Sequence, residues 1–342
     1  MMRLPHFRYH APRTVQEAAE LLARGDAMLV AGGTDLLPNM KRRQQVPETL
    51  IGLRRIAELS EIGNGSGLTI GAGVTLTALL RDVRVRDAYA GLWQAARQVA
   101  TPQLRNMGTI GGNLCLDTRC NYYDQNYEWR KAIDFCMKKD GETCWVATSS
   151  PRCLAVSSTD TAPVLQAVGA KVRLVSASGE RTIDVASLFA NDGMQYLTRR
   201  PDEILTDIQI PDQAGWRSTY WKLRRRGSFD FPVASAAVAL RFDGPRVVEG
   251  RIVLGAVASR PLASPAAEGM LRDVRLTDEV IASAADAAYD VAKPMDNTDF
   301  ELVWRKRMVR SLVTYALREL RGDDVTALRL SLARQTGLSP LS

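Results

Sequence analysis

The chain has 342 residues, of which 46% are apolar and 24% are charged, and its formal net charge is +7. This composition is typical of globular proteins with real cores and excludes a mostly disordered chain. The short arginine runs at 42–43 and 224–226 lack interleaved aromatic residues and a nucleic-acid motif, so we expect no nucleic-acid partner. They can be solvated surface, or a face that attracts an acidic redox partner or an anionic ligand.

Nothing in the sequence indicates export or membrane insertion. Residues 1–14 carry charge and proline but lack the apolar core of a signal peptide. No run of about 18 uncharged apolar residues, the length needed to span a bilayer, occurs anywhere in the sequence. We therefore expect a cytoplasmic protein that does not contact a membrane.

The predicted elements begin with a helix and a short strand. Thr14 is followed by Glu17 and by apolar residues at helical spacing, which predicts a helix over 14–22. The apolar run 28–31 predicts a strand, which the glycine pair after it ends abruptly. The next predicted elements are a helical turn over 36–40, a turn at 63–67, a strand over 68–72, helices over 75–80 and 88–99, and a loop over 101–113.

Residues 114–154 differ in character, because cysteines, aromatic residues and charges follow one another with neither helical nor strand period. Structureless connections longer than about 12–15 residues usually have a function or an internal staple, and the cysteines could be that staple. The turn-rich segment 212–216 is the expected start of a C-terminal α+β domain. The elements predicted after the cysteines are strands over 170–175, 204–210, 218–224, 233–242 and 251–257 and helices over 277–288 and 301–319.

Two glycine pairs are candidates for binding an anion. In residues 30–35 (VAGGTD), consecutive glycines after a buried strand can turn backbone N–H groups toward one point. Thr34 adds a hydroxyl donor, whereas Asp35 can cap the following turn rather than touch a phosphate that its charge would repel. Residues 108–113 (GTIGGN) offer the same chemistry, with a threonine and an asparagine able to bond a phosphate or a ribose. Taken alone, either loop could be only a tight turn.

Together, the two loops resemble the FAD-binding subunit of the xanthine dehydrogenase and carbon monoxide dehydrogenase family, through AGGTDL at 31–36 and TIGGN at 109–113. The resemblance extends to STDTAP at 158–163 and to Lys222. It implies that the first loop wraps the FAD pyrophosphate and that the second holds its other side. The FAD contacts implied in this way are Leu29, Val30, Ala31, Gly32, Gly33, Thr34, Asp35, Leu36, Thr109, Gly112, Asn113, Asp160 and Lys222.

The resemblance also implies an α+β fold with two domains. The FAD-binding domain, over 1–212, would have the two-part architecture of vanillyl-alcohol oxidase and would carry an insert over 114–154. A C-terminal domain of the carbon monoxide dehydrogenase flavoprotein type would follow over 213–325, and a tail over 326–342.

All five cysteines lie between Cys115 and Cys153, a clustering that disulfides in a large cytosolic chain would not explain. The tight C-x-x-C pairs of zinc sites do not occur in the sequence. Four thiolates on one long loop can also wrap an iron–sulfur cubane. The spacing alone therefore leaves free thiols, zinc and a cluster open.

Residues 114–125 (LCLDTRCNYYDQ) closely resemble the insert of the 4-hydroxybenzoyl-CoA reductases within this family. The resemblance implies a [4Fe–4S] cluster on Cys120, Cys136, Cys144 and Cys153, with Cys115 as a buried free thiol beside the FAD loop. Three basic residues near these ligands could offset the charge of four thiolates or could be plain surface: Lys138, Lys139 and Arg152.

The function implied by this resemblance is electron transfer, with no residue of the chain acting on the organic substrate. Electrons would pass from ferredoxin through the [4Fe–4S] cluster and FAD to the [2Fe–2S] clusters and molybdenum of two partner subunits, a small and a large one. The reaction would convert 4-hydroxybenzoyl-CoA to benzoyl-CoA in anaerobic aromatic degradation. The expected assembly is a dimer of heterotrimers.

Two other functions stay open. The chain could be the FAD subunit of an oxidising molybdenum hydroxylase for another aromatic or heterocyclic substrate, in which the insert leads electrons to a different acceptor. It could instead be a zinc-stapled, non-catalytic binding module in which the glycine loops are plain turns.

Overall fold

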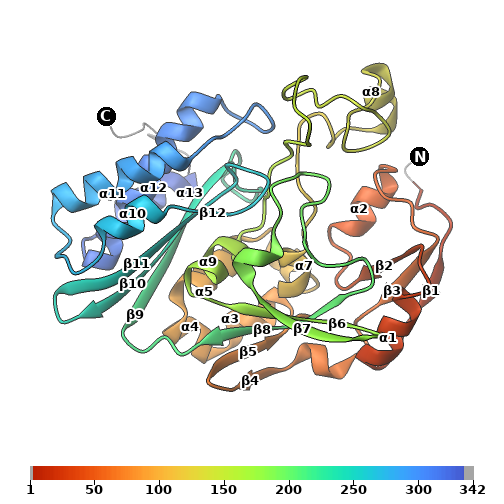
Figure 1. Ribbon diagram of the computed structural model, residues 1–342, viewed down its shortest axis with the longest axis horizontal. Helices are drawn as coiled ribbons and strands as arrows, with labels where there is room; N and C mark the ends of the chain where they lie inside the picture. Colours follow the sequence, from red (N-terminus) through yellow and green to blue (C-terminus); the bar gives the residue numbers. More distant parts are fainter. Residues whose placement is uncertain (1–2, 335–342) are drawn as a thin grey trace.

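The computed structural model describes residues 3–334, and the strands in this part of the chain form three sheets (Figure 1). The first sheet is parallel and has the order β1-β3-β2, with β1 (Arg8–His10), β2 (Ala27–Val30) and β3 (Thr49–Gly52). Thr14 begins α1 (Val15–Leu22), because its hydroxyl accepts the N–H of Glu17 at 3.1 Å. The helix predicted over 14–22 and the strand predicted over 28–31 are thus confirmed, and β2 leads through the glycine loop into α2 (Leu36–Lys41).

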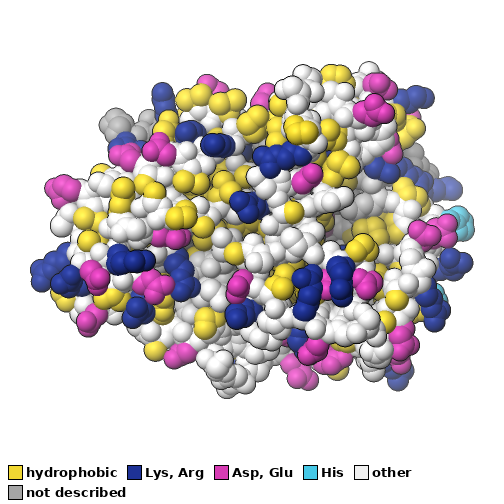
Figure 2. All heavy atoms as spheres, in the orientation of Figure 1, with side chains coloured by type: hydrophobic (Ala, Val, Ile, Leu, Met, Phe, Trp, Pro, Cys, Tyr) yellow, Lys and Arg dark blue, Asp and Glu magenta, His cyan; other side chains and the backbone are white. Residues whose placement is uncertain are grey.

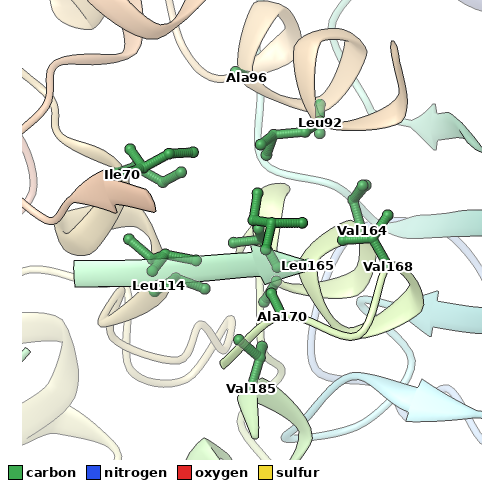
Figure 3. Packing of buried hydrophobic residues seen from close by; sticks show 14 of the residues in the cluster. Ile70, Leu92, Ala96, Leu114, Val164, Leu165, Val168, Ala170 and Val185 are labelled. Atoms are coloured by element: carbon green, nitrogen blue, oxygen red, sulfur yellow. The ribbon is translucent and has the colours of Figure 1, made fainter. Parts of the chain in front are cut away.

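The second sheet is antiparallel and joins segments from both sides of the cysteine-containing region. Its order is β4-β5-β8-β6-β7, so that β5 pairs with β8 far along the chain. The strands are β4 (Ile62–Asn64), β5 (Gly67–Gly71), β6 (Lys171–Ser176), β7 (Gly179–Asp184) and β8 (Ile204–Pro211). Around them lie α3 (Leu76–Arg81), α4 (Val83–Ala88), α5 (Ala90–Gln98), α9 (Thr161–Ala167) and the 3₁₀ turns η1 (Ala57–Ser60) and η2 (Val185–Leu188). Figure 3 shows Ile70, Leu92 and Leu165 within the apolar core that these elements share.

The third sheet lies between two apolar cores. It has the order β12-β11-β10-β9, from β9 (Trp216–Leu223), β10 (Ala234–Asp243), β11 (Arg246–Gly255) and β12 (Leu262–Ala263). Because side chains alternate along a strand, Tyr220 packs into the core of Figure 3, whereas Trp221 packs against the C-terminal helices. Those helices are α10 (Pro265–Met270), α11 (Asp278–Val291), α12 (Leu302–Arg321) and α13 (Thr326–Arg334). Among residues 3–334, no helix combines the length and the apolar character needed to cross a membrane.

The cysteine segment projects from the rest of the molecule, at the top of Figure 1. Its irregular chain carries one turn and a half of helix, α8 (Tyr127–Ala132), which Asn126 caps by accepting the N–H of Trp129 at 2.9 Å. A small buried cluster holds the base of the segment together and contains three of the thiols: Cys120, Tyr123, Cys136, Cys153 and Ala155. Cysteine side chains therefore supply much of the apolar core of this segment.

The sequence predicts a loop over 101–113, but the structure has two short helices there, α6 (Pro102–Arg105) and α7 (Ile110–Leu114). Each begins at a threonine whose hydroxyl accepts a backbone N–H, from Leu104 to Thr101 and from Gly112 to Thr109. Helices of this length do not complete the apolar repeat on which a sequence prediction depends.

The predicted tail is in part a packed helix, since residues 326–334 form α13, while 335–342 lie outside the described residues. Arg329 forms an ion pair with Glu319 of α12 at 2.6 Å and lies over the ring of Trp221 at 4.1 Å. Leu332 of α13 is buried. These contacts join residues far apart in the sequence, so the local pattern of α13 does not reveal them.

Candidate cofactor site

A cavity of about 480 Å³ lies among the loop after β2, the start of α7 and the loop between β9 and β10. Both glycine loops line it, and so does every residue predicted to contact a cofactor except Lys222. The cysteine segment contributes further wall residues, which include Asp117 and Arg119. Phe229 and Phe231 line the cavity from the C-terminal half of the chain. The two predicted loops thus face one space.

The first glycine loop is shaped for close approach to a ligand. A Cβ on Gly32 would lie 2.0 Å from the backbone oxygen of Met107, so only glycine fits there. Gly33 has φ +69°, a conformation that L side chains rarely adopt. Among the described residues, none accepts a hydrogen bond from the backbone N–H of Gly32, Gly33 or Thr34. These amides are therefore available to an anion, as the sequence predicted for a nest.

The second glycine loop is held from within by its polar side chains. The Thr109 oxygen caps α7 by accepting the Gly112 N–H at 3.0 Å, which leaves the hydroxyl proton of Thr109 free to donate. The Asn113 side-chain oxygen accepts hydrogen bonds from the Thr159 and Thr161 hydroxyls at 2.9 and 2.7 Å. These bonds tie the loop to the segment that precedes α9. Any contact of Asn113 with a ligand therefore falls to its amide nitrogen.

Asp160 and Lys222 form a buried ion pair at one wall of the cavity. Asp160 lines the cavity, and its carboxylate accepts from the Lys222 ammonium at 3.0 Å and from the Tyr220 hydroxyl at 2.8 Å. Lys222 is behind it and also donates to the Gln98 carbonyl at 3.0 Å. Burial raises the pKa of Asp160 and lowers that of Lys222, while their mutual attraction opposes both shifts.

The four cysteines predicted as cluster ligands are all buried, whereas Cys115 is half-buried and lines the cofactor cavity. Burial raises the pKa of Cys120 to about 12 and that of Cys153 to about 11. Repulsion between thiolates adds to both shifts, because Cys136 lies near Cys120 and Cys153, and Cys144 lies near Cys153. The four thiols thus share one region of the segment, and an oxidised pair is not present in the described chain.

These thiols do not surround a single point. In residues 3–334, no group of three or more His, Cys, Asp and Glu side chains is gathered closely enough to hold one metal ion. Thiolates on one zinc ion lie about 4 Å apart, since each Zn–S bond is about 2.3 Å in a tetrahedral site. In a cubane each thiolate binds a different iron, so the ligands are spaced more widely. The thiols of the described residues are therefore not arranged as a preformed zinc site.

Lys138 links the cysteine segment to the wall of the cofactor cavity. Its ammonium donates to Asp117 at 2.8 Å, to the Thr118 hydroxyl at 2.8 Å and to the Gly193 carbonyl at 2.6 Å. Its side chain is 6% exposed, against 35% for Lys139. Lys138 is therefore a buried residue of the segment and not plain surface.

Replacing Lys138 with methionine is expected to loosen the cysteine segment. The change leaves Asp117, 7% exposed, as a buried carboxylate without its cation, and breaking such a pair costs about 3–5 kcal/mol. Hydrogen–deuterium exchange over 114–154 is the measurement. Lys139→Met is the matched control, because Lys139 pairs with Asp140 near the surface and such pairs contribute about 0–1 kcal/mol. Equal exchange rates in the two variants would contradict this role.

Sequence patterns do not identify some residues of this cavity. Arg119 contacts Asp35 across 84 positions of the chain, and Tyr196 reaches the Cys115 carbonyl from 81 positions away. Neither residue belongs to a glycine loop or to the predicted set of cluster ligands. The only sequence signal for Arg119 is its place beside Cys120 within the segment that carries the resemblance.

Comparison with known proteins agrees with this geometry. The family described as the FAD binding domain in molybdopterin dehydrogenase matches residues 5–213, and the carbon monoxide dehydrogenase flavoprotein C-terminal domain matches residues 218–320. The chain therefore belongs to the family of FAD-binding medium subunits found in xanthine dehydrogenase and carbon monoxide dehydrogenase. The predicted fold class, an α+β FAD-binding domain followed by a flavoprotein C-terminal domain, is confirmed.

Several relatives are similar over nearly their whole length. The aldehyde oxidoreductase FAD-binding subunit PaoB of Escherichia coli (strain K12) is 32% identical, over 91% of this chain and 98% of that protein. The carbon monoxide dehydrogenase medium chain of Hydrogenophaga pseudoflava is 32% identical, over 92% and 96%. The solved structure of carbon monoxide dehydrogenase from the same organism, lacking the Mo-pyranopterin moiety, has a TM-score of 0.77 at 31% identity and covers 93% of this chain and 99% of that one.

These comparisons support the predicted family but not the particular enzyme predicted from the sequence. They support an FAD-binding oxidoreductase subunit, but they give no support to 4-hydroxybenzoyl-CoA reductase in particular. The names of the relatives include aldehyde oxidoreductase, carbon monoxide dehydrogenase and nicotine 6-hydroxylase. The predicted [4Fe–4S] cluster likewise has no counterpart in these names.

Proposed function

We propose that this chain is the electron-transferring FAD subunit of an oxidising molybdenum hydroxylase complex, and that its cysteine segment adds a second redox centre. The observation that best supports FAD binding is the cavity of about 480 Å³ into which both glycine loops face. The relatives named for oxidation of aldehydes, carbon monoxide and nicotine support the oxidising direction. When bound, FAD supplies the means to pass electrons singly or in pairs between the other centres.

The chain's own residues bind and orient the cofactor. The amides of residues 32–34 would hold its pyrophosphate, as part of the segment 29–36. Thr109 and Gly112 would hold the opposite side, together with the Asn113 amide. Asp160 would accept a hydroxyl group of the ligand, and Lys222 would act through Asp160 by keeping it ionised and in place.

For the second redox centre we propose a [4Fe–4S] cluster held by Cys120, Cys136, Cys144 and Cys153. All four thiols are buried, and soft sulfur ligands suit iron–sulfur chemistry. Ligation would offset the cost of burying four thiolates, because bound iron carries the opposing positive charge. The number, the burial and the chemistry of these four thiols fit such a cluster.

A second candidate function is reductive dehydroxylation of 4-hydroxybenzoyl-CoA to benzoyl-CoA, with ferredoxin as the electron donor. The observation that favours it is the cysteine segment itself, which begins with LCLDTRCNYYDQ at 114–125. Both candidates use the same FAD cavity and differ in the direction of electron flow. In neither does this chain contact the organic substrate.

The proposed partners are a large molybdopterin subunit and a small [2Fe–2S] subunit, assembled as a dimer of heterotrimers in the cytoplasm. The names of two relatives, a "medium chain" and a "medium subunit", support large and small partner chains. The division of this chain at residues 212 and 213 and the ferredoxin donor also stay proposals.

The direction of electron flow can be tested on the assembled complex. Flavin absorbance is followed after anaerobic addition of aldehydes or N-heterocycles, and benzoyl-CoA is assayed after addition of 4-hydroxybenzoyl-CoA with reduced ferredoxin. The oxidising function predicts bleaching of the flavin by a substrate of the first group and no benzoyl-CoA. Benzoyl-CoA formation with no bleaching by that group would contradict the oxidising function and establish the reductase.

A further inference from the structure

Arg119 connects the cysteine segment to the first glycine loop. Its side chain is 8% exposed and pairs with Asp35, two positions after the glycine pair, and with Asp124 at 3.1 Å. The ring of Phe231 lies over its guanidinium at 4.6 Å. Its Nε is buried and has no partner among the described residues. One arginine thus joins the glycine loop, the cysteine segment and the C-terminal half of the chain.

Asp35 places a negative charge where the bound ligand is also negative. It lines the cavity, is 30% exposed, and is adjacent to the free amides of the loop. Its position before α2 predicts a helix cap, but its side chain makes no cap hydrogen bond. Its carboxylate instead accepts from Asn39 at 2.9 Å and from Arg119. Without a counter-charge, this carboxylate would repel a pyrophosphate.

We propose that Arg119 is a positioning residue for FAD, because it neutralises Asp35 at the pyrophosphate loop. Within residues 3–334, no other lysine or arginine forms an ion pair with Asp35. Asp124, the second carboxylate on Arg119, does not line the cavity and accepts the backbone N–H of Cys120 at 3.3 Å. The cysteine segment therefore supplies the counter-charge of Asp35 at the flavin site, independently of any cluster that it holds.

The inference rests on FAD binding alone, and a double-mutant cycle on the full chain tests it. FAD dissociation constants are measured by quenching of flavin fluorescence for the wild type, Arg119→Gln, Asp35→Asn and the double variant. We expect Arg119→Gln to weaken FAD binding about 10- to 100-fold in the wild-type background. In the Asp35→Asn background the same change is expected to cost less than about threefold, since the repelling charge is gone.

The matched control is Arg251→Gln, which is expected to leave FAD affinity unchanged. Arg251 also combines an ion pair, to Glu249 at 2.9 Å, with an aromatic ring, Trp216 at 4.6 Å, and it does not line the cavity. Arg251→Gln thus removes a positive charge and a ring contact, as Arg119→Gln does, but outside the lining of the cavity.

Three results would overturn the proposal: unchanged affinity in Arg119→Gln, an equal loss in both backgrounds, or an equal loss in Arg251→Gln. An equal loss in both backgrounds would mean that Arg119 only holds the fold. If Arg119→Gln does not fold, Arg119→Lys is carried through the same cycle; lysine keeps the charge but not the fork of donors. A smaller loss of FAD affinity in Arg119→Lys that disappears in the Asp35→Asn background supports the proposal. A loss that persists in that background overturns it. A wild-type chain that binds no FAD would instead contradict FAD binding itself.

Discussion

Replacing Gly32 with alanine is expected to strip FAD from the protein. The new Cβ would lie 2.0 Å from the Met107 oxygen, which belongs to the backbone and cannot swing aside. One of the two cavity walls must then move, so that the amides of the loop no longer point at one ligand. We expect FAD affinity to fall by about 100-fold or more, which corresponds to roughly 3 kcal/mol.

The FAD-to-protein ratio after gel filtration measures this effect. Gly269→Ala is the control, because a Cβ on Gly269 meets no atom within 4 Å. A Gly32→Ala protein that retains its full flavin would show that the first glycine loop is only a turn. That outcome would also remove the main structural support for the proposed FAD site.

Replacing Lys222 with methionine is expected to destabilise the fold by about 3–5 kcal/mol, the usual cost of leaving a buried charge without its partner. Asp160, 4% exposed, would keep the Tyr220 hydroxyl as a hydrogen-bond donor and Arg224 as a more distant positive charge. Urea unfolding followed by tryptophan fluorescence measures the loss. Adding Asp160→Asn to Lys222→Met is expected to recover most of it, since the amide carries no charge.

The loss of folding stability in Lys222→Met should increase with pH. Burial already raises the pKa of Asp160, and removal of Lys222 raises it further. A carboxyl group with a raised folded-state pKa destabilises the fold as pH rises above its unfolded value of about 3.9. The deficit of Lys222→Met should therefore be smaller at about pH 5 than at about pH 8.

Arg225→Met provides the control for Lys222→Met. Arg225 pairs with Asp299 at 2.9 Å, but its side chain is 63% exposed, so the loss should stay within about 1 kcal/mol. A deficit for Lys222→Met that is no larger than this, or that grows on acidification, would contradict the buried ion pair.

The sequence was most informative where the chemistry is local. The two glycine loops were predicted because strand, glycine pair and hydroxyl residue follow one another in a single short segment. The helix after Thr14 was predicted for the same reason, since its cap and its apolar face lie within one stretch. The strands β4 and β7 were missed, because each is exposed along most of its length and lacks a continuous apolar pattern.

What the sequence could not predict depends on distant partners. Asp35 looked like a helix cap, and only the fold brings Arg119 against it. Lys222 was predicted to contact the cofactor, but β9 places it behind Asp160 and outside the cavity lining. Burial of the four cysteines followed from no pattern, because the segment has no period from which an inward face could be inferred.

The distribution of surface charge does not identify a site for a redox partner. On the face in Figure 2, Lys and Arg side chains are interspersed with Asp and Glu rather than gathered into one patch. The net charge of +7 is thus not concentrated on that face, and it does not by itself mark a site for an acidic redox partner. A partner site is better sought near the projecting segment, where the proposed second redox centre lies.

Iron, sulfide and flavin quantitation after anaerobic purification with the partner subunits tests whether this chain holds both FAD and a second redox centre. We expect about four irons and one FAD for each copy of this chain, on the Cys₄ ligation rule. Cys136→Ser should lose the iron and keep the FAD, whereas the control Cys115→Ser should keep its iron, because Cys115 lies outside the proposed ligand set. FAD together with zinc, or with no metal, would leave the flavin site standing and contradict the second redox centre.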